Sequence, residues 1–469
     1  MGPVTRRLFG TDGVRGVAGE FLTAELALAL GSEATRRAGK PRPQVLIIRD
    51  TRESGEMLQA AVAAGVAAAG GDALLGGVLP TPAAPLLIAR YGFDLAVVLS
   101  ASHNPFADNG IKFFAGDGYK LSDQAEMAIE LALSEPHGAP GPAGHADTGD
   151  AGHSAPGTAC PPALGAAPVA IGRIRELRGA PEDYLRELHT RFAALDLHGL
   201  DVLLDCANGA THHVAPEIFR RLGAKVTVIA DQPDGRNIND GCGSTHIGEL
   251  GGRVREASHA LGFAFDGDGD RVLAVDRRGE VVDGDELMAL IALHLRAAGR
   301  LSGDGVAVTV MTNYGFHAAM ARAGLEVATT AVGDRYVLEE LRARGWTLGG
   351  EQSGHIIEMG FNRTGDGLAG ALLALEALAG RDLSERDAMV KLPQRLVNVR
   401  VRDRDALHGA TVVADAVSDA QERLAGRGRV LVRPSGTEPL VRVMVEAPSE
   451  QEAEELCAGL AGLVERELG

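Results

Sequence analysis

The sequence predicts an α/β protein with three related α/β domains, whose sheets are mixed and mainly parallel, followed by a C-terminal α+β domain. Short apolar runs alternate with helical patterns through most of the chain. This alternation is typical of parallel sheets whose two faces are covered by helices. From residue 385 onward the order of segments changes, and strand-like segments there surround a single helix before a closing one.

Length and composition agree with several globular domains. A chain of 469 residues is too long for one hydrophobic core, so three or four domains are expected. Hydrophobic residues make up 45% and charged residues 23%, which are ordinary values for a globular protein. The net charge of −17, without a run of Lys or Arg, argues against a nucleic-acid partner. A local arginine cluster can still bind an anion.

The chain carries no sign of export or membrane insertion. Its 4 cysteines are widely spaced and form no CxxC pair, which favours a reduced, cytoplasmic location. The N-terminal segment lacks the apolar region of a signal peptide. No apolar run reaches the roughly 18 residues that a membrane span needs. We therefore expect a soluble protein without a membrane partner.

The first predicted domain covers residues 1–170. A strand at Val45–Ile48, a helix at Gly55–Ala69 and a strand at Leu95–Leu99 follow one another. Residues 137–170 are rich in Gly, Ala and Pro, which predicts a flexible insertion. The segment also contains His137, His145, His153 and Cys160, but their irregular spacing favours solvated loop residues over a metal site.

Two further α/β domains are predicted at residues 171–280 and 281–384, and each repeats the strand–helix–strand pattern. In each, a strand leads into a polar turn, a helix and a second strand. The strands are expected at Asp201–Leu204, Lys225–Ile229, Val306–Met311 and Glu326–Thr330. The α+β domain, residues 385–469, is expected to contain segments Val397–Val401, Val412–Leu424, Val430–Val445 and Glu450–Glu467.

The segment Leu99-Ser-Ala-Ser-His-Asn-Pro105 is the first candidate site. It places Ser102 just after the end of an apolar strand, where open α/β sheets bind their ligands. An ordinary strand-to-loop turn is the alternative. A hydrolase triad is disfavoured because the glycines of GxSxG are missing and His103 is an immediate neighbour. A serine that carries phosphate fits better.

The segment Asp266-Gly-Asp-Gly-Asp-Arg271 is the second candidate. Its three carboxylates, Asp266, Asp268 and Asp270, alternate with glycines that allow a tight turn. This pattern suits one hard divalent cation, Mg²⁺. A calcium-binding EF-hand would need Gly and Glu where Arg271 and Arg277 stand. The remaining alternative, an acidic surface turn, would bring three like charges together without a cation.

Two further segments carry polar side chains suited to a phosphosugar. Gly349-Gly-Glu-Gln-Ser-Gly-His355 offers Glu, Ser and His to sugar hydroxyls, although an ordinary polar turn could look the same. Arg433-Pro-Ser-Gly-Thr-Glu-Pro-Leu-Val-Arg442 offers the donors that a phosphate needs. Arg442 interrupts an apolar run, so an anionic partner is expected there, with a solvent-facing Arg as the alternative.

The usual nucleotide-binding motifs are missing. The sequence has no GxxxxGK[ST] loop, no GxGxxG after a strand and no kinase HRD set. Phosphate handling and a cation without a nucleotide motif favour a donor phosphate held on the protein itself.

The four segments, in this order, resemble the α-D-phosphohexomutase family over essentially the whole chain. The segments Leu8-Phe-Gly-Thr-Asp-Gly-Val-Arg-Gly16, Val332-Gly-Asp-Arg-Tyr-Val337 and EQSGH are most similar to its phosphoglucosamine mutase branch. The resemblance implies domains arranged around a central cleft, with a mobile last domain. EQSGH in place of the commoner ENSGH, and the long Gly/Ala/Pro segment, depart from the family pattern.

The resemblance also implies roles for individual residues. Ser102 would be the phosphorylated residue, and Asp266, Asp268 and Asp270 would hold Mg²⁺ beside its phosphate. Arg15, Lys112, Arg271 and His355 would line the reaction centre, with Lys112 and His355 as candidates for acid–base work. Glu351 and Ser353 would contact sugar hydroxyls. The phosphate that is not transferred would be bound by Arg433, Ser435, Gly436, Thr437 and Arg442.

The implied reaction interconverts glucosamine 6-phosphate and glucosamine 1-phosphate, and supplies UDP-N-acetylglucosamine and cell-wall precursors. It would need one Mg²⁺ per active site, phosphorylated Ser102 and a sugar 1,6-bisphosphate as activator. The partner is a small phosphosugar, and a homodimer is left open. Alternatives are a phosphomannomutase/phosphoglucomutase, a serine-dependent sugar phosphatase and a non-catalytic phosphosugar sensor. The residues do not show directly what meets the 2-substituent of the sugar.

Overall fold

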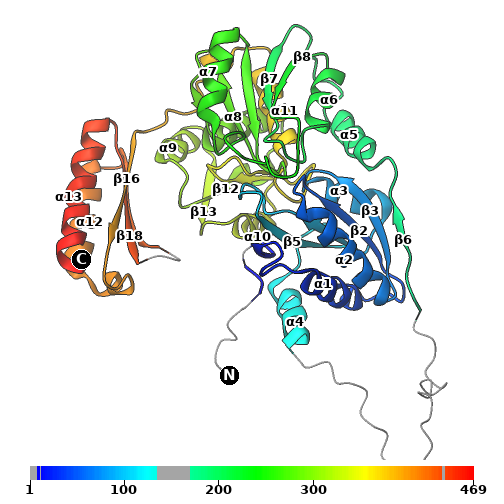
Figure 1. The fold of residues 1–469 in the computed structure, drawn as a ribbon. Helices are drawn as coiled ribbons and strands as arrows, with labels where there is room; N and C mark the ends of the chain where they lie inside the picture. The colour runs from blue at the N-terminus through cyan, green and yellow to red at the C-terminus, as the bar shows by residue number, and fades with distance from the viewer. Residues whose placement is uncertain (1–7, 11, 135–169, 436–438) are drawn as a thin grey trace, which may run out of the picture. The chain divides into compact units, whose positions relative to one another are not determined.

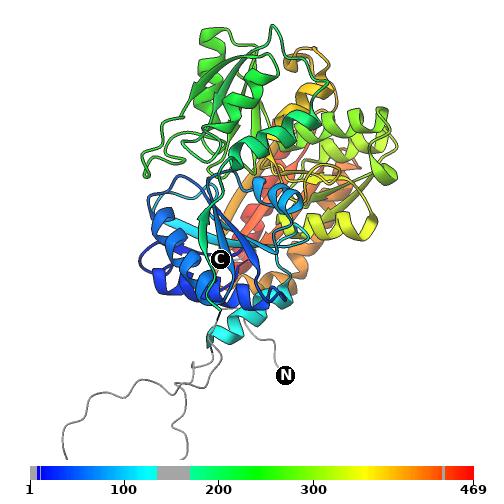
Figure 2. The same cartoon turned by 90° about the vertical axis from the view of Figure 1, so that its right-hand side faces the viewer.

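The computed structural model describes residues 8–10, 12–134, 170–435 and 439–469. Contacts divide the chain into a first unit, Met1–Glu187 with Pro233–Ile238, and a second unit, Leu188–Gln232 with Asn239–Gly469. Within the described residues, the first unit contains one of the four sheets and the second unit contains the other three. Figures 1 and 2 show the sheets and their helices in two views.

The first unit is built on a six-stranded mixed sheet in the order β1-β5-β4-β2-β3-β6. The strands β4, β2, β3 and β6 run parallel, whereas β5 is antiparallel to both β4 and β1. The strands are β1 (Val14–Val17), β2 (Gln44–Arg49), β3 (Asp72–Val78), β4 (Leu95–Leu99), β5 (Asp108–Ala115) and β6 (Ile174–Glu176). Residues of β4 are all buried, as expected for a central strand covered on both faces.

Helices of the first unit pack against this sheet and against one another. They are α1 (Ala24–Arg37), α2 (Ser54–Ala68), α3 (Ala83–Tyr91), α4 (Asp123–Ser134) and the first part of α5 (Ala180–Arg191). The N-terminus of α1 is capped by the Thr23 side chain, which accepts a hydrogen bond from the backbone N–H of Leu26. Helix α2 packs on α1 and on the parallel strands, and Figure 1 shows both helices beside the sheet.

The second unit contains two α/β sheets. One has the order β11-β10-β9-β7-β8 and the other has the order β13-β12-β14-β15. In each sheet three neighbouring strands are parallel and the others add antiparallel pairs. The strands are β7 (Asp201–Asp205), β8 (Lys225–Ile229), β9 (Leu261–Phe265), β10 (Val272–Asp276), β11 (Val281–Val282), β12 (Gly305–Thr309), β13 (Glu326–Thr330), β14 (Leu348–Gly350) and β15 (Ile356–Glu358).

The helices that accompany these two sheets follow the strand–helix–strand repeats. They are α6 (Val214–Arg221), α7 (Ile247–Ala257), α8 (Gly284–Ala297), α9 (Tyr314–Arg322), α10 (Asp334–Arg344) and α11 (Gly367–Leu378), with short 3₁₀ turns at Ser302–Asp304 and Leu383–Glu385. Helix α8 begins with a capping box, in which Asp283 and Glu286 satisfy each other's backbone N–H groups. Helix α11 is buried along nearly its whole length.

The last sheet is antiparallel throughout, with the order β16-β18-β17. Its elements are β16 (Gln394–Arg400), a 3₁₀ turn (Asp405–Gly409), α12 (Thr411–Leu424), β17 (Arg429–Pro434), β18 (Leu440–Glu446) and α13 (Glu450–Leu468). Figure 1 shows both helices on one face of the sheet. Apolar side chains of α12, α13 and β18 form one core there.

The predicted fold class is confirmed. The sheets of the α/β part are mixed and mainly parallel, and the C-terminal part is α+β, with an antiparallel sheet and two helices. The predicted strand ending at Met311 stops instead at Thr309, and the backbone carbonyls of Val310 and Thr312 accept hydrogen bonds from Arg429. The segment 137–170, with its histidines and Cys160, lies outside the described residues up to residue 169. The four predicted domain limits and the central cleft stay predictions. No helix in the described parts of the chain has the length and hydropathy required to span a bilayer.

Candidate functional site

Ser102 lies in a buried turn just beyond the end of β4. Its side chain is 1% exposed, and its φ of 53° falls in the left-handed region that a residue with a side chain seldom adopts. Its backbone N–H donates to Ser100 Oγ at 3.0 Å, and its Oγ lies 3.3 Å from His103 Nδ1. An unusual backbone conformation at a candidate nucleophile is the kind of strain found at functional sites.

A second group in the first unit surrounds Asp12. Its carboxylate forms ion pairs with Lys112 at 3.0 Å, with Lys120 at 2.5 Å and with Arg15. Burial alone would raise the pKa of Asp12, but Lys112, Lys120 and Arg15 hold that pKa well below its ordinary value. Lys112 itself is 1% exposed. Three cations around one carboxylate leave local positive charge, which favours an anionic ligand such as phosphate.

Asp12 and Lys120 were missed by the sequence analysis. Asp12 belongs to the segment that resembles the family, but its charge gave no hint of a partner more than a hundred positions away. Strand pairing explains the contact. Lys112 lies on β5, and Val14, just after Asp12, pairs with Ile111 on the same strand. No local pattern in the sequence reveals this pairing.

The aspartate triplet forms the tip of a hairpin in the second unit. The buried strand β9 leads into Asp266, and β10 returns antiparallel to it from Val272. Asp266, Asp268 and Asp270 are 1%, 1% and 4% exposed, and one carboxylate oxygen from each lies within 4.8 Å of the others. The left-handed φ of 69° at Gly269 allows this tight turn.

The donor set of this hairpin fits a hard divalent cation. Three buried carboxylates repel one another, and an oxygen-binding cation removes that repulsion. Arg271 compensates part of the charge, with its Nε 3.8 Å from Asp270. Burial acts to lower the pKa of Arg271, but Asp270, Asp266, Glu351 and Asp268 raise it above its ordinary value. The triplet could therefore hold one metal ion.

The segment 349–355 packs directly against the aspartate hairpin. The backbone N–H of Val272 donates to the carbonyl of Gly354 at 3.0 Å, and the backbones of Arg271 and His355 form an isolated antiparallel β-bridge. Glu351 is half-buried, and its Oε1 accepts a hydrogen bond of 3.1 Å from the backbone N–H of Gly333. Ser353 is exposed. The fold thus brings the predicted metal loop and the predicted sugar loop together within one unit.

His355 is buried between two carboxylates. Its Nδ1 lies 3.6 Å from Asp270 and its Nε2 lies 3.6 Å from Asp334. Burial lowers the pKa of His355, but Asp270, Asp334 and Glu351 raise it above the ordinary value. The backbone N–H of Gly365, however, donates to Nε2 at 3.0 Å. A nitrogen that accepts this bond carries no proton, so we favour the neutral ring with its proton on Nδ1 toward Asp270.

Two arginines face each other in the C-terminal sheet. Arg433 on β17 and Arg442 on β18 are direct cross-strand partners, and both are half-buried. Burial and the neighbouring Arg442 lower the pKa of Arg433. Like charges directly opposite each other destabilise a sheet, and an anion between them would reverse the effect. Buried Ser435 follows Arg433, whereas Gly436 and Thr437 lie outside the described residues.

The predicted site residues fall into both units. Ser102, Arg15 and Lys112 belong to the first unit. The segments predicted to bind the metal, the sugar and the second phosphate belong to the second unit. That Ser102 meets the aspartate triplet at one cation stays a prediction.

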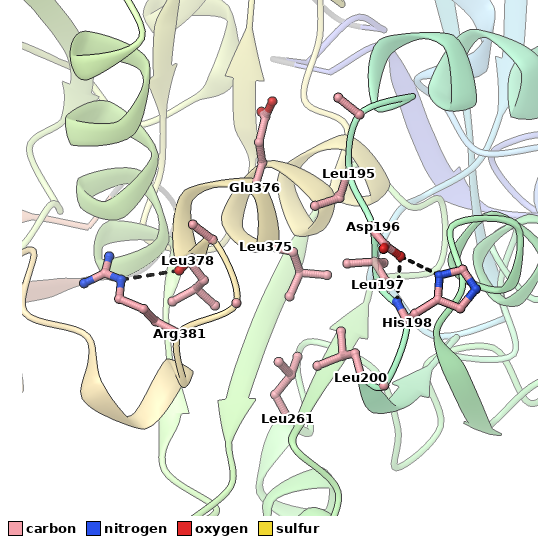
Figure 3. Close-up of a pocket in the computed structure, with 14 residues that line it drawn as sticks. Leu195, Asp196, Leu197, His198, Leu200, Leu261, Leu375, Glu376, Leu378 and Arg381 are labelled. Carbon is pink, nitrogen blue, oxygen red and sulfur yellow. Dashed lines mark hydrogen bonds and ion pairs between the residues drawn. The ribbon is translucent and has the colours of Figure 1, made fainter.

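A cavity of about 530 Å³ lies elsewhere in the second unit (Figure 3). It is formed by residues 194–200 and by the C-terminal end of α11 with the residues that follow it, and leucines such as Leu195 and Leu378 line it. Asp196 and His198, drawn in the figure, bond to each other at 2.5 Å. Among the residues that the structure describes, no predicted site residue lines this cavity. Its lining combines leucines with a few polar side chains, among them Glu376 and Arg381, and it contains none of the segments predicted to bind metal, sugar or phosphate, so we assign it no part in the reaction.

A serine that could carry phosphate and an acidic cluster able to hold a cation are features that enzymes of phosphate transfer use. Comparison with known families supports this class. The chain matches the phosphoglucomutase/phosphomannomutase alpha/beta/alpha domains I, II and III over residues 6–137, 182–279 and 283–396, and the C-terminal domain over residues 396–463. It belongs to the phosphoglucomutase/phosphomannomutase family, that is, the phosphohexomutases, and is a mutase.

Curated relatives and solved structures agree. The chain is 51% identical over 460 residues to a phosphoglucosamine mutase from Moorella thermoacetica, covering 97% of this chain and 98% of that protein. It is 48% identical over 466 residues to the one from Mycobacterium tuberculosis, covering 98% and 99%. A family protein from Burkholderia thailandensis has the same fold, with a TM-score of 0.75, 21% identity and 97% of both chains covered. The N-acetylphosphoglucosamine mutase from Aspergillus fumigatus, solved with GlcNAc-6P and magnesium, gives a TM-score of 0.65 at 18% identity, with 98% of this chain and 96% of that chain covered.

Proposed function

We propose that this enzyme interconverts glucosamine 6-phosphate and glucosamine 1-phosphate through a phosphoserine at Ser102, in the cytoplasm. The observation that carries the choice of sugar is the identity of 48–51% over nearly the whole chain to phosphoglucosamine mutases. The contact between the aspartate hairpin and the segment 349–355 supports the chemistry, because a cation and a sugar-binding loop would meet there. The product would feed the synthesis of UDP-N-acetylglucosamine and cell-wall precursors.

In the proposed reaction, phosphorylated Ser102 transfers its phosphoryl group to a free hydroxyl of the sugar monophosphate. The bond between phosphorus and Ser102 Oγ breaks, a bond to the sugar oxygen forms, and a base takes the proton of that hydroxyl. The resulting 1,6-bisphosphate turns around, and its other phosphate returns to Ser102. A trace of the bisphosphate would keep the enzyme phosphorylated.

Charge placement is what the protein contributes most to such a transfer. Mg²⁺, held by Asp266, Asp268 and Asp270 together with Ser102, would neutralise charge on the transferred group. Arg15 and Lys112 offer positive charge in the first unit, and Arg271 offers it in the second. Lys112 is our candidate for the acid–base group, since the neutral His355 accepts a backbone hydrogen bond and faces Asp270.

The rest of the sugar phosphate would be bound by the second unit. Glu351 and Ser353 would contact hydroxyls. The phosphate that is not transferred would lie between Arg433 and Arg442, with Ser435, Gly436 and Thr437 as further donors. The like charges that face each other across β17 and β18 support this assignment. Gripping either end of the sugar would require the C-terminal domain to move between the two half-reactions.

The test is an exchange assay on glucosamine 6-phosphate with Mg²⁺ and a trace of glucosamine 1,6-bisphosphate. We expect turnover by the wild-type enzyme and less than about a thousandth of it for Ser102→Ala, which lacks the nucleophile. Intact-mass analysis should find one phosphate on the wild type and none on the variant. Full turnover by Ser102→Ala would overturn the proposal.

The same assay separates the alternatives. A kcat/KM that is higher on mannose 1-phosphate or glucose 1-phosphate would favour a phosphomannomutase/phosphoglucomutase. Steady release of inorganic phosphate would favour a serine-dependent phosphatase. A homodimer is a separate proposal, and light scattering on the purified protein would check it.

A further inference from the structure

A buried ion pair, Asp50–Arg52, lies beside the Ser102 turn. Both side chains are 0% exposed, and Arg52 Nε lies 2.9 Å from Asp50 Oδ2. The pair follows β2, whose last residue, Arg49, pairs with Leu99 at the end of β4. Burying two charges costs desolvation energy that their attraction barely repays, so a buried ion pair is weak evidence of stability. The contacts of the two side chains with the turn indicate another role.

The other two nitrogens of the Arg52 guanidinium donate hydrogen bonds to the turn itself. Its Nη2 donates to the backbone carbonyls of Ser102 and Asn104, both at 2.9 Å, and its Nη1 donates to the carbonyl of Pro105 at 2.8 Å. These contacts use the planar, forked geometry of a guanidinium, which an ammonium cannot reproduce. Three carbonyls of one short turn are thus fixed by a single side chain.

Asp50 holds the same turn from the other side. Its Oδ2 accepts a hydrogen bond of 2.5 Å from Ser100 Oγ, and Ser100 Oγ in turn accepts the backbone N–H of Ser102 at 3.0 Å. Both backbone groups of Ser102 are therefore hydrogen-bonded to the Asp50–Arg52 pair. The N–H is linked to Asp50 through Ser100, and the C=O accepts directly from Arg52.

This double attachment explains how Ser102 keeps its left-handed backbone. A residue with a side chain holds such a conformation only where its surroundings fix it from several directions. The direction of the Cα–Cβ bond follows the backbone, so the conformation fixes Cβ and thereby limits Oγ to the few positions that the staggered rotamers allow. If the turn relaxed to an ordinary φ, Oγ would move away from those positions.

We propose that Arg52 is a positioning residue of the phosphoryl transfer, which with Asp50 holds Ser102 in its left-handed conformation and so aims Oγ. The proposal rests on the phosphoserine role proposed above for Ser102. Arg52 contacts main-chain carbonyls of the turn, and its role is exerted through Ser102.

The main test is Arg52→Lys. The variant keeps a positive charge next to Asp50 but loses the fork that holds three carbonyls. We expect kcat on glucosamine 6-phosphate to fall by about 100-fold while KM changes by less than about threefold, as for a misplaced reacting group. Arg42→Lys is the matched control, because Arg42 pairs with Asp72 at the surface, 2.8 Å apart, and should leave kcat unchanged.

A second readout separates positioning from folding. A purely structural role would lower the amount of folded enzyme but leave kcat per folded molecule at the wild-type value, and this result would overturn the proposal. Thermal unfolding and active-site titration with the phosphorylated form measure that amount. Slower transfer from pre-phosphorylated Ser102 to the sugar, followed by intact mass, would support positioning.

If Arg52→Lys does not fold, Ser100→Ala decides. This variant removes the link from Ser102 N–H to Asp50 and leaves the ion pair in place, so we expect about a tenfold loss of kcat. An unchanged kcat in folded Ser100→Ala would overturn the proposal. Failure of the proposed function looks different, because there the wild type would be inactive or Ser102→Ala would be active.

Discussion

Buried carboxylates are neutralised differently in the two units of the molecule. In the first unit, Asp12 is surrounded by Lys112, Lys120 and Arg15, and Asp50 is paired with Arg52. The second unit also has buried ion pairs, such as Asp276 with Arg386 at 3.0 Å, but in two places its carboxylates lie close to one another. Asp266, Asp268 and Asp270 share one hairpin, and Asp283 and Asp285 share the start of α8, where Lys391 lies 2.5 Å from Asp283.

The difference indicates which groups of charged residues are organised without a ligand. Built-in cations fix the Ser102 turn and the Asp12 group, so the first unit can be organised before any ligand binds. The aspartate hairpin has only part of its charge balanced, by Arg271 at 3.8 Å from Asp270, because the neutral His355 at 3.6 Å can donate a hydrogen bond but carries no charge. The second unit therefore gains most from a bound cation, and metal should stabilise it selectively.

Asp268→Asn should give the largest effect. It removes one carboxylate ligand without changing shape, so we expect kcat at saturating Mg²⁺ to fall by at least about 100-fold. Without metal, the same change removes repulsion among three buried carboxylates and should raise the free energy of unfolding by roughly 1–3 kcal/mol. Steady-state kinetics and denaturant unfolding, with Mg²⁺ and with a chelator, measure both.

The expected result is a crossover, with the wild type more stable in Mg²⁺ and the variant more stable in the chelator. Asp387→Asn is the control, because that side chain is 84% exposed and lies 3.7 Å from Arg381. If the chelator leaves wild-type stability unchanged, the hairpin does not depend on a cation and the comparison between the two units fails.

Asp12→Asn should have a smaller effect on kcat, because Asp12 acts through the neighbouring Lys112 and Arg15. Losing the charge frees Lys112 and Arg15 to reorient, and we expect about a tenfold drop in kcat. The folded pKa of Asp12 is depressed. Its contribution to stability is therefore present above the unfolded pKa of about 3.9 and is lost as pH falls through the folded value.

The stability gap between the wild type and Asp12→Asn should thus be widest at neutral pH, roughly 1–3 kcal/mol, and should narrow below about pH 4. Urea unfolding at pH 7 and pH 3 measures it. Exposed Glu20→Gln should show no comparable gap. A gap that does not vary with pH would mean that the charge of Asp12 is not what matters.

The sequence revealed those parts of the molecule that depend on local pattern. The apolar run Leu95–Leu99 is strand β4, and the segments Lys225–Ile229 and Glu326–Thr330 are strands β8 and β13 with the predicted limits. The aspartate triplet was also visible, because the glycines that alternate with the three aspartates indicated a tight turn, and the structure brings the carboxylates together there.

Long-range pairing hid the rest. The contact of Arg52 with the carbonyl of Ser102 joins positions 50 residues apart, and that of Lys120 with Asp12 joins positions 108 residues apart. Such contacts depend on strand order, which places β4 between β5 and β2. The left-handed backbone of Ser102 was hidden for the same reason, since it is imposed by Asp50 and Arg52 and not by the serine itself.

Asp285→Asn should have the smallest effect on turnover of the three variants, and its stability shows whether the clustering of acids has a cost away from the hairpin. Asp285 is 0% exposed, and burial together with Asp283 raises its pKa to about 8. A raised pKa in a carboxyl means that the fold disfavours its charged form. Stability is therefore lost as pH rises from about 4, near the unfolded pKa, toward 8.

Asparagine stays neutral and can still accept the 2.8 Å hydrogen bond from the backbone N–H of Asn313. Near pH 4 the variant should melt at the same temperature as the wild type. At pH 8.5 it should melt higher, by about 2–4 °C for each kcal/mol of unfavourable charge burial that the substitution removes. Thermal unfolding between pH 4 and 9 measures the difference, in which groups common to both proteins cancel. A variant that is less stable than the wild type at pH 8.5 would show that charged Asp285 has a favourable partner, and that the second unit balances its acids as the first unit does.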